Sequence, residues 1–129
     1  TSAYPSWQLI SEGGTVYMVY KNTKTGFSSA SVFTGLGFKF GNVLPAGYSN
    51  LNNSGYIVNS AHSSHPWGTW IINGASTVYF VHESGLIPVP DWGTFIANGG
   101  QASFIVSANS ADFTLPILTV MANSDSRLK

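Results

Sequence analysis

The side chains that could carry acid–base chemistry are few and far apart in this sequence. They are five carboxylates and three histidines: Glu12, Glu83, Asp91, Asp112, Asp125, His62, His65 and His82. A hydrolytic site needs a general acid and a general base held in one cleft, and a glycosidase needs a pair of carboxylates. No spacing in the sequence pairs these groups. Most of the carboxylates fall in predicted turns, at a predicted helix start or in the C-terminal tail. We therefore predict no catalytic residues and no enzyme.

Metal and cofactor motifs are equally weak. His62 and His65 lie three residues apart, but two ligands are fewer than a structural zinc ion needs, and the chain has no cysteine. The Gly-x-Ser-x-Gly elbow of serine hydrolases does not occur. Gly35-Leu36-Gly37 is too short for a phosphate loop and fits the end of a helix instead. We predict no metal and no cofactor, and we expect His65 to support the turn before Trp67.

Large aromatic rings are the more informative set. Four Trp and six Tyr are many for 129 residues, and such rings favour places with an apolar body and a wet edge, including interfaces. Core packing is expected to use most of them. A glycan site would draw on the rings that a repeated fold does not need, and the candidates for ligand binding are Trp67, Trp70, Trp92, Tyr48 and Tyr56.

Composition excludes several classes of partner. Only 8% of the residues are charged and the formal net charge is zero, so no basic face for nucleic acid can be built. No apolar run approaches the roughly 20 residues of a membrane span. The low charge is typical of extracellular β-rich modules and of subunits that pack against copies of themselves. The chain begins at Thr1, so we expect that a leader was removed or that the sequence is part of a longer one.

The chain contains an internal repeat. A shift of 62 positions superimposes several residues of the first half on identical residues of the second. Thr15, Val16, Tyr17, Val19, Phe33, Gly37 and Ala46 fall on Thr77, Val78, Tyr79, Val81, Phe95, Gly99 and Ala108. One residue of slippage before this region brings Pro5 onto Pro66. Two copies are too few for a solenoid, so we predict two related units that share one core.

Each unit has the same local plan. A short apolar segment (7–10 or 69–72), a turn with Gly and an alternating run (15–20 or 77–82) predict a β-hairpin. A third short strand is expected near residues 26–27 and 86–88. Ser28 in one unit and Pro90-Asp91-Trp92 in the other predict the start of a short helix. Gly37 and Gly99 should end these helices in the left-handed conformation, and Phe33 and Phe95 should anchor them to the sheet.

The predicted fold class is therefore mainly β (α+β), a pseudo-symmetric pair of units that each contain a β-hairpin and a short helix. The chain forms a single domain, with the internal repeat at 4–51 and 65–113 and a linker at 52–64 that contains one strand at 56–58. A C-terminal strand and tail follow at 114–129. This strand is apolar from Phe113 to Met121, and Pro116 favours an edge position for it.

The repeated residues resemble a module of predicted bacterial surface and cell-wall-associated proteins, often from uncultured lineages. The match rests on His65-Pro66-Trp67-Gly68-Thr69, Thr77-Val78-Tyr79-Phe80-Val81 and residues 90–99 in the second unit, and on residues 26–37 in the first. The first unit departs at its start, where Pro5-Ser6-Trp7-Gln8 replaces the Pro-x-Gly-Thr pattern, and the second has Gly93-Thr94-Phe95 where Val-Phe is usual. The resemblance implies a non-catalytic extracellular role at the cell surface, and it supplies no ligand residues.

Two functions follow as hypotheses. The first is a structural subunit of a surface assembly, such as a filament, pilus or surface layer, whose partners are copies of itself or other surface components. The residues expected to mediate self-association, by pairing with the sheet edge of a neighbour, are Phe113, Leu115, Ile117 and Val120; alternatively, this segment completes its own sheet. The second function is a carbohydrate-binding or adhesive module that uses exposed Trp and Tyr rings on glycans.

Overall fold

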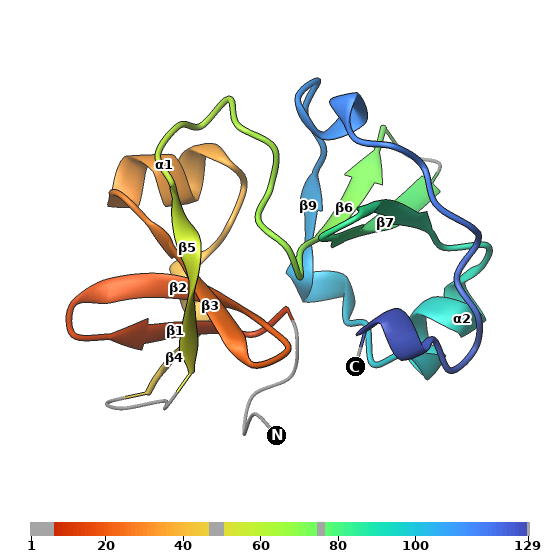
Figure 1. The fold of residues 1–129 in the computed structure, drawn as a ribbon, viewed down its shortest axis with the longest axis horizontal. Helices are drawn as coiled ribbons and strands as arrows, with labels where there is room; N and C mark the ends of the chain where they lie inside the picture. Colours follow the sequence, from red (N-terminus) through yellow and green to blue (C-terminus); the bar gives the residue numbers. More distant parts are fainter. Residues whose placement is uncertain (1–6, 47–50, 75–76, 129) are drawn as a thin grey trace.

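Two β-sheets make up most of the protein. The structure is a computed structural model that describes residues 7–46, 51–74 and 77–128. Within these residues the fold is mainly β, with nine strands in two sheets and two short α-helices, α1 (Ala30–Gly35) and α2 (Trp92–Ala97). The helices lie toward opposite ends of the long axis of the molecule (Figure 1). The predictions of a mainly β fold and of two short helices are confirmed.

The first sheet contains five strands in the order β4-β1-β2-β3-β5. Their bounds are β1 (Leu9–Glu12), β2 (Thr15–Tyr20), β3 (Thr23–Phe27), β4 (Val43–Pro45) and β5 (Asn52–Val58). Strand β2 is antiparallel to β1 and β3, whereas β4 runs parallel to β1 and β5 parallel to β3. The β1–β2 turn is built from Gly13 and Gly14, whose φ angles of 61° and 85° favour glycine.

The second sheet contains four strands in the order β8-β7-β6-β9. Their bounds are β6 (Trp70–Asn73), β7 (Thr77–His82), β8 (Gly85–Pro88) and β9 (Ile105–Ser107). Strand β7 is antiparallel to β6 and β8, and β9 is parallel to β6. The order β9-β6-β7-β8 thus matches β4-β1-β2-β3, including the direction of every strand.

Both helices begin at side-chain caps. The Oγ of Ser29 accepts a hydrogen bond from the backbone N–H of Val32, and Oδ1 of Asp91 accepts one from Thr94. The prediction of Ser28 as the cap of α1 is wrong by one residue, because the backbone N–H of Ser28 still donates to Val58 of strand β5. The prediction that Pro90 lies in the first turn of α2 is also wrong, because Asp91 is the cap and Pro90 precedes it.

The ends of the helices agree with the sequence pattern. Gly37 and Gly99 follow the C-caps and have φ angles of 98° and 88°, the left-handed conformation that only glycine adopts easily. Phe33 of α1 and Phe95 of α2 are fully buried. No helix among the described residues is long and apolar enough to cross a bilayer.

The apolar core draws on both sheets. One cluster packs Leu9 and Met18 of the first sheet with Ile71, Val81 and other residues of the second. Another packs Tyr20 of strand β2 among side chains of the second sheet, of the chain after β8, of α2 and of the C-terminal segment. A smaller cluster, Ile10, Val19 and Leu51, lies apart from both. Burial on this scale supplies most of the free energy that holds the two sheets together.

Two segments differ from the sequence prediction. The range expected to be a linker, 52–64, contains the seven-residue strand β5, of which only the end was expected. The strand expected at 113–121 is instead a 3-10 turn (Asp112–Thr114) followed by extended chain with a single bridge from Ile117 to Leu86. The backbone N–H of Leu86 donates to Pro116 and that of Leu118 donates to Leu86, so this chain runs along the outer edge of β8. Pro116 cannot donate a hydrogen bond, which limits a longer ladder.

Candidate functional site

The structure brings two of the predicted ligand residues together between the sheets. The rings of Tyr56 and Trp67 meet edge to face with 5.1 Å between centroids, and Trp67 also meets Tyr20 at 5.8 Å. The backbone N–H of Trp67 donates to the hydroxyl of Tyr56 at 3.3 Å. Tyr56 is 36% exposed and Trp67 is partly buried. These rings form the aromatic junction, which joins strand β5, the segment just before β6 and the end of β2.

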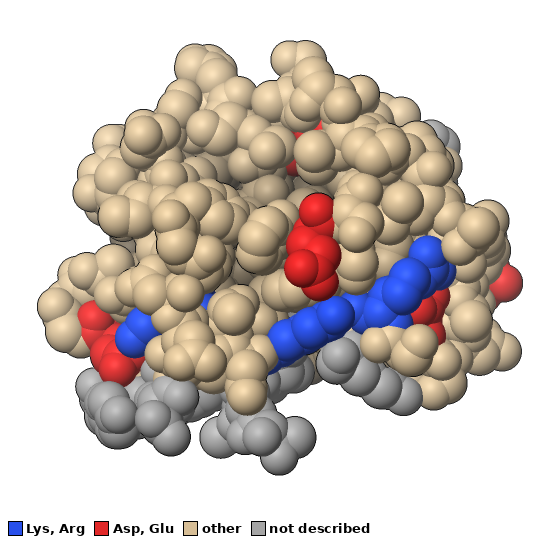
Figure 2. Space-filling model, viewed as in Figure 1, with Lys and Arg blue, Asp and Glu red and all other residues tan. Residues whose placement is uncertain are grey.

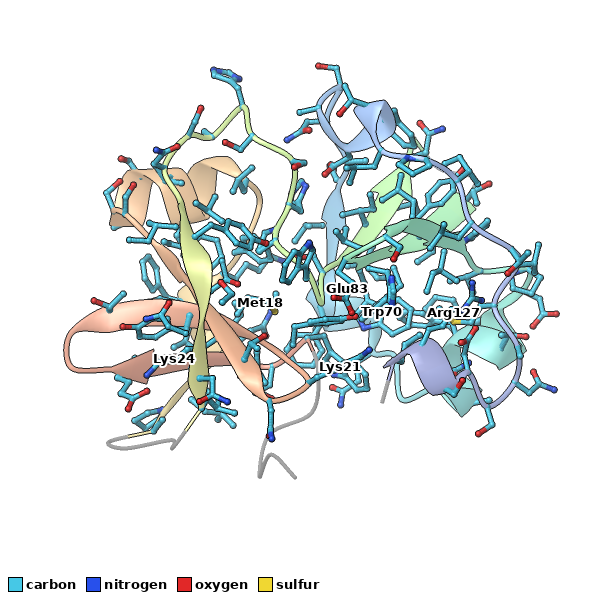
Figure 3. The ribbon with its side chains drawn as sticks, in the orientation of Figure 1. Met18, Lys21, Lys24, Trp70, Glu83 and Arg127 are labelled. Atoms are coloured by element: carbon cyan, nitrogen blue, oxygen red, sulfur yellow. The ribbon has the colours of Figure 1, made fainter. Side chains whose placement is uncertain are left out.

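Charged and polar groups border the aromatic junction. The hydroxyl of Tyr20 donates to Glu83 at 3.2 Å, and the Nζ of Lys21 lies 3.6 Å from the same carboxylate. Figure 3 shows Lys21 and Glu83 side by side near the middle of the molecule. Burial, together with the charge of Glu83, raises the pKa of Tyr20; burial and then the charge of Lys21 lower the pKa of His82. Hydroxyl-rich ligands would find both donors and acceptors beside the rings.

The other predicted ligand residues fall elsewhere. Trp70 is fully buried, within 5 Å of the Phe80 and Phe95 rings, so the prediction that it contacts a ligand is wrong. The position lies inside strand β6, where the fold requires an apolar side chain. Its indole N–H has no hydrogen-bond partner among the described residues. Trp92 is 54% exposed at the start of α2. Tyr48 lies outside the described residues.

Trp92 has a structural counterpart that the sequence alignment does not show. Its ring covers Phe95 at 4.7 Å between centroids, and in the first unit the ring of Phe40 covers Phe33 at 4.6 Å. With the shift of 62 positions, Trp92 aligns with Ala30, and Phe40 aligns with Ala102. Both units therefore place a half-exposed ring over the helix phenylalanine, but from different positions in the sequence.

The residues predicted to mediate self-association are mostly exposed. Phe113, Ile117 and Val120 are 39%, 55% and 58% exposed, whereas Leu115 packs partly against the core. The ring of Phe113 contacts Tyr79 at 5.6 Å. The backbone of this segment is hydrogen-bonded to β8 of the same chain. Only its exposed side chains are therefore available for contact with another molecule.

Each carboxylate has a partner within the fold. Glu12 lies 2.9 Å from Lys24, Asp125 lies 2.6 Å from Arg127, Glu83 pairs with Lys21, Asp112 pairs with His65, and Asp91 caps α2. No group of three His, Asp or Glu side chains that could hold a metal ion occurs among the described residues. The carboxylates thus have structural roles in this geometry.

The pair His65–Asp112 is the feature that sequence reasoning missed. Asp112 Oδ2 lies 2.7 Å from Nδ1 of His65, its Oδ1 accepts the backbone N–H of His65, and its Oδ2 also accepts that of Asn109. The Nε2 of His65 donates to the carbonyl of Leu36 at 2.8 Å, and both charged side chains are buried. The residues are 47 positions apart, so no local pattern announces the pair.

This pair links three parts of the chain, and both ring nitrogens of His65 are hydrogen-bonded within the fold. A carbonyl oxygen only accepts, so Nε2 must carry hydrogen, and an ionised Asp112 requires the same of Nδ1. The ring of His65 is thus held between the end of α1 and the 3-10 turn. Burial raises the pKa of Asp112, but the hydrogen bonds from His65 and Asn109 and the charge of His65 outweigh burial, so the pKa lies below its usual range.

Comparison with models of protein families, with curated proteins and with solved structures gives no match for this chain.

Proposed function

We propose that the chain is a non-catalytic module of a bacterial cell surface that packs against copies of itself or against other surface components. The distribution of charge carries this proposal. The chain has ten Lys, Arg, Asp and Glu residues, and six of them form three ion pairs within the fold. Most charged atoms on the face in Figure 2 lie in a band across its lower half, with uncharged surface above. A surface with little charge and no net charge favours association.

Exposed apolar side chains strengthen the case for self-packing. They occur on β5, on α2 and on the C-terminal segment, and include Ile57, Trp92, Ile96, Ile117 and Val120 at 50–62% exposure. Strand β5 also forms one edge of its sheet and carries no charged residue and no proline. Charged residues and proline are two of the features that protect edge strands from pairing with another chain, and β5 lacks both, although a register shift between its Asn53 and Ile57 interrupts the ladder.

The location outside the cell rests on the resemblance to bacterial surface modules and on the composition. An assembly such as a filament, pilus or surface layer is the form of self-packing that fits both. An attachment role for the same surface is compatible with this proposal, since the exposed apolar side chains could contact a different surface component.

The fold proposed for this role is a pseudo-symmetric pair of units. Its support is the shared strand order and a set of contacts between equivalent positions. Lys21 pairs with Glu83, and the ring of Tyr20 lies 6.0 Å from that of His82. Both pairs are separated by the repeat interval, since 83 − 21 and 82 − 20 equal 62. Residues at equivalent positions touch where two units meet about a twofold axis.

Multi-angle light scattering over a wide concentration range, with negative-stain microscopy, tests the proposed function. We expect the mass to grow with concentration and ordered particles to form. A monomer at the highest attainable concentration would overturn self-packing for this chain. A pull-down against cell-wall fragments would then be the test of the attachment role.

A second candidate function is carbohydrate binding at the aromatic junction, favoured by the partly exposed Tyr56 ring on Trp67 and by the Glu83–Lys21 pair next to Tyr20. A glycan array with the wild-type chain and the Tyr56→Ala variant tests it. Trp92→Ala is the matched control, because Trp92 is exposed but lies away from the junction, on α2. Glycan binding that survives Tyr56→Ala would exclude the junction as the site.

A further inference from the structure

Two of the described charged side chains, Lys39 and Asp91, have no ion-pair partner among the described residues. Of the Lys and Arg residues that the structure describes, Lys21, Lys24 and Arg127 lie within 4 Å of a carboxylate, and Lys39 does not. Of the carboxylates, Asp91 alone has no cationic partner in the described part of the chain. Both side chains are exposed. Since the other Lys, Arg, Asp and Glu side chains of the described residues are paired within the fold, Lys39 and Asp91 are the unpaired charges of that part of the chain.

Each unpaired charge lies beside a half-exposed ring. Lys39 precedes Phe40, which is 51% exposed, and Asp91 precedes Trp92, which is 54% exposed. Phe40 lines a shallow hollow of about 190 Å³. The walls of the hollow include Val16, Phe27, Phe33 and the start of α1, and they contain no charged side chain.

We propose that the Lys39–Phe40 surface of one copy of the chain binds the Asp91–Trp92 surface of a second copy. Opposite charges and two exposed rings make the surfaces complementary, and the hollow beside Phe40, lined by apolar side chains and by the hydroxyls of Thr15, Ser28 and Ser29, is the recess proposed for the Trp92 ring of the neighbour. Buried aromatic side chains next to a charged rim are the usual anatomy of an interface. This inference rests on the proposed self-packing function and names the contact that produces it.

The position of the two surfaces determines the form of the assembly. One surface lies at the 3-10 turn Phe40–Asn42, which follows α1, and the other lies at the start of α2. In the proposed contact, the two surfaces of one copy bind two different neighbours. A contact between two different surfaces repeats from copy to copy, and it produces an open chain unless its rotation closes a ring.

Charge variants test the contact, and the chain itself suggests the neutral replacements. The residue aligned with Lys39 is Gln101 and the residue aligned with Asp91 is Ser29. Lys39→Gln should weaken association about two- to fivefold, the usual effect of one exposed ion pair. Lys39→Glu should weaken it further, because it places two negative charges together. Asp91→Asn keeps an oxygen for the helix cap and should restore most of the extra loss when combined with Lys39→Glu.

Two further variants separate the ring from the charge. Trp92→Ala should weaken association at least about tenfold, as expected of a central aromatic residue. Asn22→Asp, in the β2–β3 turn, changes the net charge by the same amount as Lys39→Gln and should leave association unchanged. Association is measured by light scattering and sedimentation, and far-UV circular dichroism checks that each variant is folded.

The outcomes distinguish this contact from the general function. If the wild-type chain assembles, but Lys39→Glu and Trp92→Ala assemble with the same concentration dependence, the contact is refuted and self-packing stands. If Lys39→Glu weakens assembly and Asp91→Asn does not reverse that effect, the two charges do not meet. If the wild-type chain stays monomeric, both the contact and the self-packing function are refuted.

Discussion

Replacing Asp112 with asparagine is the sharpest test of how the fold is held together. The substitution keeps the shape of the side chain and removes its charge. In the wild-type structure, one carboxylate oxygen accepts the backbone N–H of His65, and the other accepts Nδ1–H of His65 and the backbone N–H of Asn109. The new amide nitrogen therefore faces a donor in either orientation, and the buried His65 ring loses the carboxylate beside its Nδ1.

The expected loss is large for a single polar substitution. Breaking a buried ion pair by removing one partner costs about 3–5 kcal/mol. A domain of this length loses about 4 °C in Tm per kcal/mol, so Tm should fall by about 12 to 20 °C. The loss should be far greater than that of Asp91→Asn, whose carboxylate is fully exposed and whose role as a cap asparagine can fill.

The assay is urea unfolding followed by Trp fluorescence at neutral pH and again under acid conditions. The pKa of Asp112 is lower in the folded chain than in the unfolded chain. Its contribution to stability is therefore complete above the unfolded pKa of about 3.9 and is lost as the pH falls through the folded pKa. The Asp112→Asn variant should lack this part of the acid dependence.

A control and a refuting result complete the test. His65→Gln and the double variant allow a double-mutant cycle, in which the two losses should be strongly non-additive because the groups touch. A loss below about 1 kcal/mol for Asp112→Asn, in the range of a solvent-exposed ion pair, would refute the claim that the buried pair joins α1 to the 3-10 turn. If the stability of the Asp112→Asn variant falls with acid as much as that of the wild-type chain, the acid dependence does not come from Asp112.

Three further predictions concern other parts of the fold. The pKa of Asp125 is lowered to about 2, chiefly by the hydrogen bond from Arg127, so Asp125→Asn should flatten the loss of stability between about pH 4 and pH 2 in acid titration. Gly68 has a φ of 96°, and a Cβ there would lie 2.7 Å from a backbone oxygen of β2. Gly68→Ala should therefore lower the free energy of unfolding by about 1–3 kcal/mol in urea. An unchanged urea midpoint would contradict this close approach of the two backbones. Phe40→Ala should destabilise the first unit, and adding Ala30→Trp should recover part of the loss in Tm, because the second unit covers its helix phenylalanine in that way.

Local rules explain what the sequence could predict. The hairpins follow from alternation and from glycine turns, and the helix ends follow from Gly37 and Gly99, where only one residue type suits the backbone. The burial of Phe33 and Phe95 follows from their place on a short amphipathic helix. These features depend on neighbours in the chain, and a repeated pattern at a fixed interval makes each of them visible twice.

The failures share one physical origin, which is contact between distant residues. His65 and Asp112 have no sequence signal because only folding brings them together. Trp70 is expected to contact a ligand because the position of its register equivalent, Leu9, holds no aromatic ring, yet Leu9 and Trp70 are both buried. Both positions thus face the core, and a ring that has no aromatic equivalent in the other half of the chain is not for that reason exposed.

The two rings that cover the helix phenylalanines come from different positions in the sequence and follow different charges. A ring covers the helix phenylalanine in both units, from Phe40 in one and from Trp92 in the other, so the ring itself is a requirement of the fold. The adjacent charges differ, because Lys39 accompanies one ring and Asp91 the other. Two units with the same charge at this place would repel each other when copies meet end to end. Opposite charges beside the two rings are therefore what the proposed contact between copies needs.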